Sequence, residues 1–125
     1  MIVIDLRYCG LSVVPSATLA ALDQLQVLEL RGNGITALPS TVGRLSSLQR
    51  IMLEMNLVTT LPREICSLHN LTHLYLAYNM LKALPDCIGQ LTALNDIWLR
   101  GNAISTLPDS FCDLSKLSSL YIMGA

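Results

Sequence analysis

Two acidic residues, Asp5 and Glu29, are the first candidates for chemistry because both sit between apolar residues in the same local pattern. If those segments are neighbouring strands, the carboxylates lie about 4.8 Å apart, near the separation that a retaining glycosidase needs. Arg7 and Arg31 follow them by two residues and reach the same face. Solvated carboxylates beside arginines normally form salt bridges of little energetic consequence. We therefore expect ion pairs here and no catalytic residues.

The sequence offers no second route to catalysis. His73 and Cys9 are three strands apart in the same arrangement, which is too far for a nucleophile and its base. The sequence contains no phosphate-binding loop, no zinc-ligand spacing and no Ser-His-Asp arrangement. We expect a protein that is not an enzyme and that needs neither a metal nor a cofactor.

The four cysteines are dispersed along the chain and form no CxxC pair. They are Cys9, Cys66, Cys87 and Cys112. Zinc sites require closer ligand spacing, and these residues fall on different turns of the repeat described next. We expect four reduced thiols.

The elements that position these residues come from a repeat with a period of 23 residues. Each unit contains two apolar residues two positions apart, an asparagine three positions later, then Leu-Pro and two further apolar residues. Four complete units contain the asparagine, and partial units lie on either side of them. We predict one domain over 1–125, with repeats at about 1–24, 25–47, 48–70, 71–93 and 94–116 and a partial repeat at 117–125.

One unit is predicted to form a short strand and an outer turn. Over residues 74–76, apolar and other residues alternate with the period of a strand that buries one face. The proline that follows lacks the N–H that a strand ladder needs. After it, Ser40, Asp86 and Asp109 are expected to cap helical turns. Strands of successive units stack in parallel, and bulkier outer turns should curve the stack with the sheet inside.

The asparagine column is predicted to be structural. A buried amide at the end of each strand can bond N–H and C=O groups of its own turn and of the neighbouring turn. This ladder consists of Asn33, Asn56, Asn79 and Asn102, with Cys9 in the place of asparagine in the first unit.

The composition argues against two classes of partner. With 8 Lys and Arg against 9 Asp and Glu, the chain lacks the basic field that nucleic-acid binding needs. It is 52% hydrophobic, but the longest uncharged segment, 8–22, is interrupted by polar residues, glycine and proline. A spanning helix needs about 20 consecutive apolar residues, so we expect no membrane insertion. Residues 1–5 show no secretory leader, which predicts a cytoplasmic protein.

The repeat LxxLxLxxNxLxxLPxxIxxL resembles the leucine-rich repeats of the 23-residue intracellular type, as in Ras-suppressor-like and Scribble-like scaffolds, over nearly the whole chain. The resemblance implies an α/β solenoid, a right-handed superhelix with a curved parallel sheet on the concave face. Short helices or 3-10 turns would form the convex face. It further implies an intracellular adaptor or signalling scaffold that binds a protein or peptide on the concave sheet.

Side chains between the inward leucines should form that concave surface. Tyr75, Trp98 and Tyr121 then occupy one column of three successive strands as an exposed aromatic stripe. Tyr and Trp are enriched in binding hot spots, so we expect a partner-binding role; the alternative is that the rings only cover the sheet. The predicted site comprises Arg50, Met52, His73, Tyr75, Trp98, Arg100 and Tyr121, with the two arginines favouring an acidic ligand.

Two other functions stay open, namely a recognition segment of a leucine-rich-repeat receptor or secreted effector and the substrate-selecting part of a larger enzyme. The sequence begins and ends in a predicted strand without a polar capping repeat. Exposed apolar ends favour association. We therefore expect the isolated chain to self-associate or to be marginally stable.

Overall fold

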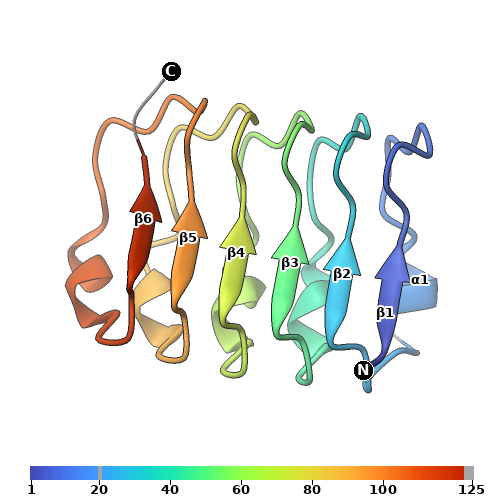
Figure 1. The fold of residues 1–125 in the computed structure, drawn as a ribbon, viewed down its shortest axis with the longest axis horizontal. Helices are drawn as coiled ribbons and strands as arrows, with labels where there is room; N and C mark the ends of the chain where they lie inside the picture. Colours follow the sequence, from blue (N-terminus) through green and yellow to red (C-terminus); the bar gives the residue numbers. More distant parts are fainter. Residues whose placement is uncertain (20, 123–125) are drawn as a thin grey trace.

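The computed structural model describes residues 1–19 and 21–122 as a row of six strands with a helical turn between each strand and the next (Figure 1). The strands are β1 (Val3–Asp5), β2 (Val27–Glu29), β3 (Arg50–Met52), β4 (His73–Tyr75), β5 (Asp96–Trp98) and β6 (Ser119–Tyr121). The connections contain the α-helix α1 (Ser16–Leu19) and the 3-10 turns η1 (Ser40–Arg44), η2 (Arg63–Ser67), η3 (Ile88–Gln90) and η4 (Asp109–Asp113).

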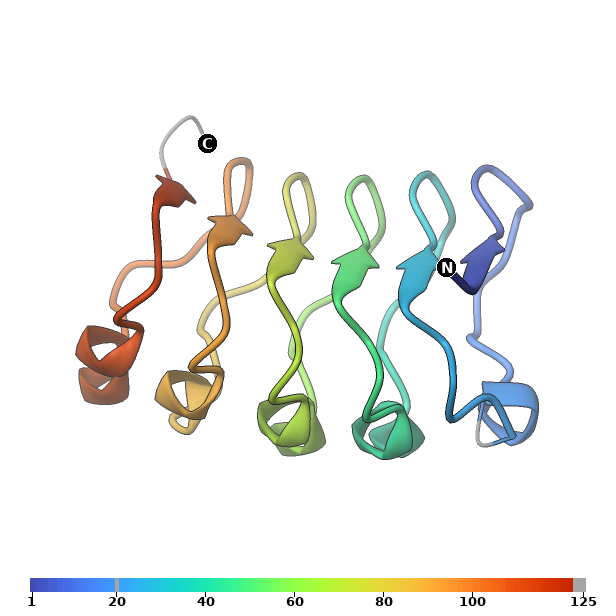
Figure 2. The same cartoon turned by 60° about the horizontal axis from the view of Figure 1, so that its bottom comes forward.

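The strands form one parallel sheet in the order β1-β2-β3-β4-β5-β6. Its register follows the repeat, because Leu28 pairs with Ile51 and Ile51 pairs with Leu74, each 23 residues further on. In Figure 2 the helical turns are spread further apart than the strands, so the stack curves with the sheet on its inner side. The structure thus confirms the repeating solenoid with a parallel sheet and 3-10 turns.

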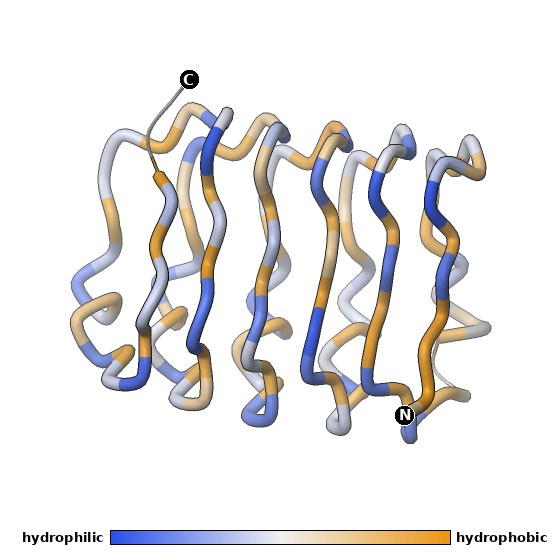
Figure 3. Tube along the Cα trace, in the orientation of Figure 1, coloured by the Kyte–Doolittle hydropathy of each residue, from blue (hydrophilic) through white to orange (hydrophobic). Residues whose placement is uncertain are grey.

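The core lies between the sheet and the helical turns. Leu28, Leu74 and Ile97 are fully buried at the centres of their strands, and Leu45 and Leu68 are fully buried where the outer turns end. Burying one such side chain contributes about 1.5–3 kcal/mol. Figure 3 shows hydrophobic and hydrophilic positions alternating along the strands. The opposite face of each strand is therefore left for polar and aromatic side chains.

The outer turns begin differently from the prediction. Pro39, Pro62 and Pro108 are the N-cap residues of their turns, and no N-cap residue of the four 3-10 turns makes a side-chain cap hydrogen bond. Ser40 and Asp109 are the first residues inside their turns, and Asp86 lies before the N-cap of η3, so the expected side-chain caps are wrong. The reason is that the proline carbonyl takes this role: in η1 it accepts the N–H of Val42 at 3.1 Å.

The asparagine amides bind the backbone of two successive turns. The Nδ2 of Asn79 donates to the carbonyls of Leu53 (2.9 Å) and Leu76 (3.0 Å), and its Oδ1 accepts the N–H of Val58 (3.0 Å). The same bonds recur for the other three asparagines, Asn33, Asn56 and Asn102. Cys9 has no amide, and its thiol donates only to the carbonyl of Arg7 at 3.4 Å.

Cys66 and Cys87 are joined by a disulfide, so the expectation of four reduced thiols is wrong. Their Cα atoms are 6.0 Å apart, and they are 21 residues apart in sequence. That separation is nearly one repeat, so a distance that appears long in the sequence joins neighbouring turns of the solenoid. Cys9 and Cys112 are free and exposed.

Replacing Asn79 with alanine should lower the free energy of unfolding by about 1–3 kcal/mol, because buried carbonyl and N–H groups lose their partners. Asn70→Ala is the matched control, since that exposed amide makes a single bond, to the carbonyl of Ser46 at 2.9 Å. Thermal denaturation of the two variants measures the difference. Equal melting temperatures for Asn79→Ala and the unmodified protein would contradict a stabilising role for the amide.

Thiol titration of the denatured protein should count two free thiols without a reductant and four after reduction. The two expected without reductant are Cys9 and Cys112. Peptide mapping of the non-reduced protein should recover Cys66 and Cys87 in one linked fragment. A count of four before reduction would show that the disulfide is absent.

Candidate functional site

Three aromatic rings lie in contact across the last three strands of the concave sheet. We call Tyr75, Trp98 and Tyr121 the aromatic stripe. The rings of Tyr75 and Trp98 are stacked, with centroids 4.0 Å apart and an interplanar angle of 19°. Trp98 and Tyr121 meet edge to face, with centroids 5.6 Å apart at 88°. The stripe is continuous because the strand register places the three residues side by side.

His73 fixes one border of the stripe. Its ring meets Tyr75 edge to face at 5.8 Å, and its Nε2 lies 3.1 Å from Oδ2 of Asp96. Its Nδ1 is 2.7 Å from the hydroxyl of Thr72. Both ring nitrogens therefore have protein partners, and the histidine acts as a support of the surface. Cys9 lies on the first turn, away from it.

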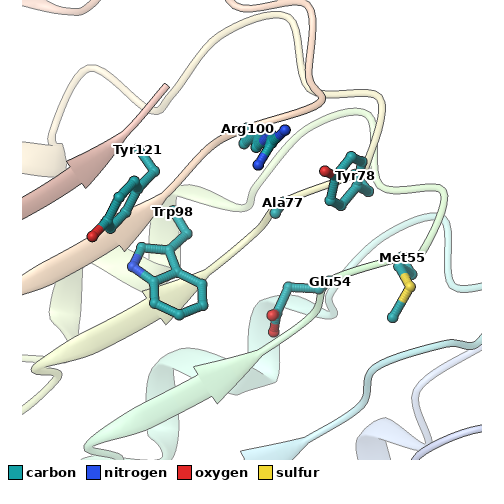
Figure 4. Close-up of a pocket in the computed structure, with 7 residues that line it drawn as sticks. All are labelled: Glu54, Met55, Ala77, Tyr78, Trp98, Arg100 and Tyr121. Atoms are coloured by element: carbon teal, nitrogen blue, oxygen red, sulfur yellow. The ribbon is translucent and has the colours of Figure 1, made fainter. Parts of the chain in front are cut away.

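A hollow of about 400 Å³ adjoins the stripe. Figure 4 shows the rings of Trp98 and Tyr121 on one side of it, with Tyr78 and Met55 on the other and Ala77 between them. Three residues of the predicted site line this hollow, namely Trp98, Arg100 and Tyr121. The other four, Arg50, Met52, His73 and Tyr75, are not among its lining residues and lie on β3 and β4.

The hollow exists because one position in a column of long side chains is an alanine. Two residues beyond the end of each strand, successive turns have Arg31, Glu54, Ala77 and Arg100. Glu54 and Arg100 extend on either side of Ala77, which has only a methyl group. The missing side-chain volume leaves a space between the two charged residues.

Tyr78 and Met55 line the hollow from a position that sequence reasoning missed. Both have a left-handed backbone, with φ of 59° and 58°, and Gly32 and Gly101 hold the equivalent positions with φ of 71° and 76°. A Cβ at Gly101 would overlap the ring of Tyr78, so the glycine allows that ring to lie over the next turn. The sequence did carry a signal for these residues, because glycine at this position in two units is typical of a left-handed turn residue. In the other units the same backbone conformation directs the side chain toward the edge of the sheet.

The two charged residues of the hollow have weak or no ion pairs. Glu54 is 9% exposed, its Oε1 is buried without a hydrogen-bond partner, and that atom lies 3.9 Å from Nε of Arg31. Burial raises the pKa of Glu54 because it disfavours the charged form, and the nearby Arg31 opposes this. Arg100 is exposed and forms no salt bridge with any described residue. The hollow therefore presents an acid on the β3 side and a base on the β5 side.

The carboxylates at the other end of the sheet are neutralised by their own strands. Arg7 binds Asp5 with its Nε at 3.0 Å and its Nη2 at 2.9 Å. Arg31 binds Glu29 in the same way, with its Nη2 at 2.8 Å from Oε2. The hydrogen bonds from Arg7 lower the pKa of Asp5. Each of the two carboxylates is thus paired with an arginine, and neither is left free to act as a general acid or base.

Metal-binding clusters and membrane-spanning helices are both missing from residues 1–19 and 21–122. No group of three or more His, Cys, Asp and Glu side chains in these residues is placed to hold a metal ion. No helix among them combines the length and the apolar character that crossing a membrane requires.

Comparison with known proteins agrees with the geometry. Residues 23–81 match the family model described as leucine rich repeat. The chain is similar to the solved structure of the leucine-rich-repeat protein LIC12759 of Leptospira interrogans, with a TM-score of 0.87 and 35% sequence identity over 91% of this chain. It spans only 29% of the length of that chain. The sequence matches none of the curated proteins with which it was compared.

Leucine-rich-repeat domains are generally protein-interaction modules and are typically non-catalytic, and no enzyme family matches this sequence. The repeat, the six-stranded parallel sheet and the two matches together show that the chain has a leucine-rich-repeat fold.

Proposed function

We propose that this chain binds an extended peptide, or the edge of a protein domain, on its concave sheet across the aromatic stripe. The observation that carries the proposal is the hollow of about 400 Å³ beside three contiguous aromatic rings. Tyr121 is 56% exposed although it belongs to a strand of the sheet. Exposed aromatic side chains next to a concave space supply large contact area at low conformational cost, which favours partner binding.

The size of the sheet limits the affinity of this chain by itself. Six strands spaced about 4.8 Å apart span roughly 24 Å. A standard interface buries about 800 Å² on each partner, which is large for a surface of this width. An extended peptide fits better than a whole domain, and we expect modest affinity.

The cellular role of such a module depends on its compartment. The sequence pattern favours an intracellular adaptor or signalling scaffold in the cytoplasm. The Cys66–Cys87 disulfide favours the second candidate, a receptor or secreted recognition segment, because disulfides persist mainly in oxidising compartments. Fractionation of the native cells, with non-reducing peptide mapping of Cys66 and Cys87 in each fraction, decides between the two.

The binding role is tested with Trp98, which is the only tryptophan of the chain. Peptides selected from a displayed random library should change the fluorescence of Trp98 on binding. The variant Trp98→Ala should then lose about 2 kcal/mol of binding free energy if the ring is a hot spot. Fluorescence anisotropy of a labelled selected peptide measures this loss, and Trp98→Phe should recover part of it.

Asp86→Ala is the control for this series, because Asp86 is exposed on the outer side before η3. It should bind the selected peptides with unchanged affinity. Equal affinity for the unmodified protein and Trp98→Ala would mean that the stripe only covers the sheet.

We also propose that the 125-residue chain self-associates through its two end strands. Ile2, just before β1, and Val3, in β1, are each 50% exposed, and Leu120 is 38% exposed in β6. Apolar side chains exposed at the ends of a repeat stack favour association. Light scattering over a hundredfold concentration range should show a mass that rises with concentration. A monomer at every concentration would contradict this.

A further inference from the structure

We propose that the hollow over Ala77 is a specificity pocket with a fixed charge polarity. It takes one apolar side chain of an extended peptide, with a basic residue of that peptide at Glu54 and an acidic residue at Arg100. This inference rests on the proposed function and names the class of peptide that the site selects.

The apolar anchor follows from what surrounds Ala77. Its methyl group forms the floor of the hollow, and the walls are the rings of Trp98, Tyr121 and Tyr78 with the thioether of Met55 (Figure 4). Tyr78 lies against Gly101, so that wall is held by the next turn of the solenoid. Aromatic rings and methionine favour contact with apolar groups. A ligand side chain would occupy the volume that the neighbouring turns fill with their own long side chains.

The charge polarity of the pocket follows from which charged residues, two positions beyond the end of each strand, already have ion-pair partners. Arg7 and Arg31 each hold a carboxylate of their own strand through two nitrogen atoms. Arg31 therefore approaches Glu54 only to 3.9 Å while it binds Glu29 at 2.8 Å. Glu54 lacks a close cationic partner, and Arg100 has no anionic partner among residues 1–19 and 21–122. Complementary charges of a ligand would satisfy both, and charge complementarity fixes the register of a bound chain.

The spacing of the strands sets the spacing of the motif. Glu54 and Arg100 follow β3 and β5, which are separated by β4, so their backbones are about 9.6 Å apart. An extended peptide advances about 3.3 Å per residue. Because alternate side chains of an extended peptide point to the same side, basic, apolar and acidic residues at every second position would all face the sheet, with the apolar residue above Ala77. The outer two are then about 13 Å apart along the peptide, and their long side chains reach back to Glu54 and Arg100. An acidic preference alone, as expected from Arg50 and Arg100, would leave Glu54 without a partner.

The test is selection from a displayed library of random decapeptides on four versions of the chain. The unmodified protein should enrich peptides with a basic residue, an apolar residue and an acidic residue in one fixed order along the chain. Arg100→Glu should bind those peptides about tenfold more weakly and should enrich peptides in which a basic residue replaces the acidic one. Ala77→Leu, which fills the hollow, should bind them about tenfold more weakly without changing the charge pattern.

Arg44→Glu is the charge-matched control, because Arg44 is an exposed residue of the outer turn η1. It should enrich the same peptides as the unmodified protein. Thermal denaturation shows whether each variant folds. If Ala77→Leu does not fold, the exposed Arg100→Glu decides the polarity without it.

The results separate this inference from the proposed function. Peptides whose binding depends on Trp98 but that show no fixed charge order, or that bind Arg100→Glu and Ala77→Leu with unchanged affinity, overturn the specificity pocket and leave the proposed function standing. Selected peptides that bind Trp98→Ala as well as the unmodified protein overturn the proposed function. A library from which the unmodified protein enriches nothing contradicts both.

Discussion

The bonds of the asparagine amides set the register of the whole solenoid. Each amide joins carbonyls of two successive turns and accepts an N–H of the preceding turn, so a shift of one residue would leave all three backbone groups unpaired. Asn56 and Asn79 are buried, where such groups have no water to replace the amide. This requirement fixes the register between successive turns, and the constant register keeps equivalent side chains in columns. Both the stack of aromatic rings and the hollow over Ala77 depend on those columns.

The sequence was sufficient for the repeating elements because every unit carries the same pattern. Strand positions such as Leu28, Ile51 and Leu74 recur at one spacing, so parallel pairing and the buried face follow from periodicity. The disulfide was not predicted because Cys66 and Cys87 are 21 residues apart in the sequence. That separation is close to one repeat, so the two residues lie on neighbouring turns. Single-unit features of this kind have no counterpart in the other units, and a pattern shared by all units cannot reveal them.

The candidate site could be predicted only in part, for a related reason. Alternation along a strand identifies Trp98 and Tyr121 as surface residues, since each follows the apolar residue at the centre of its strand. The contributions of Tyr78 and Met55 depend on a left-handed backbone just beyond the strand, which alternation does not describe. Ala77 contributes by its small size, and a search for reactive or bulky side chains passes over it. A hollow is defined by missing volume, so it appears only when neighbouring turns are placed side by side.

The concave sheet is divided into two parts with different surface chemistry. In β1 and β2 the acids are bound by arginines two residues away, so little uncompensated charge is left for a partner. From β3 to β6 the last residue of each strand is Met52 or a member of the aromatic stripe. The column two residues further on contains an acid and a base that lack close partners. A charge on the buried Glu54 without a close partner costs stability in the free protein, whereas the Arg31–Glu29 pair shows that this fold can neutralise such a group within one turn. The fold thus leaves uncompensated charge and exposed aromatic area together on the same four strands, where an incoming chain would satisfy both.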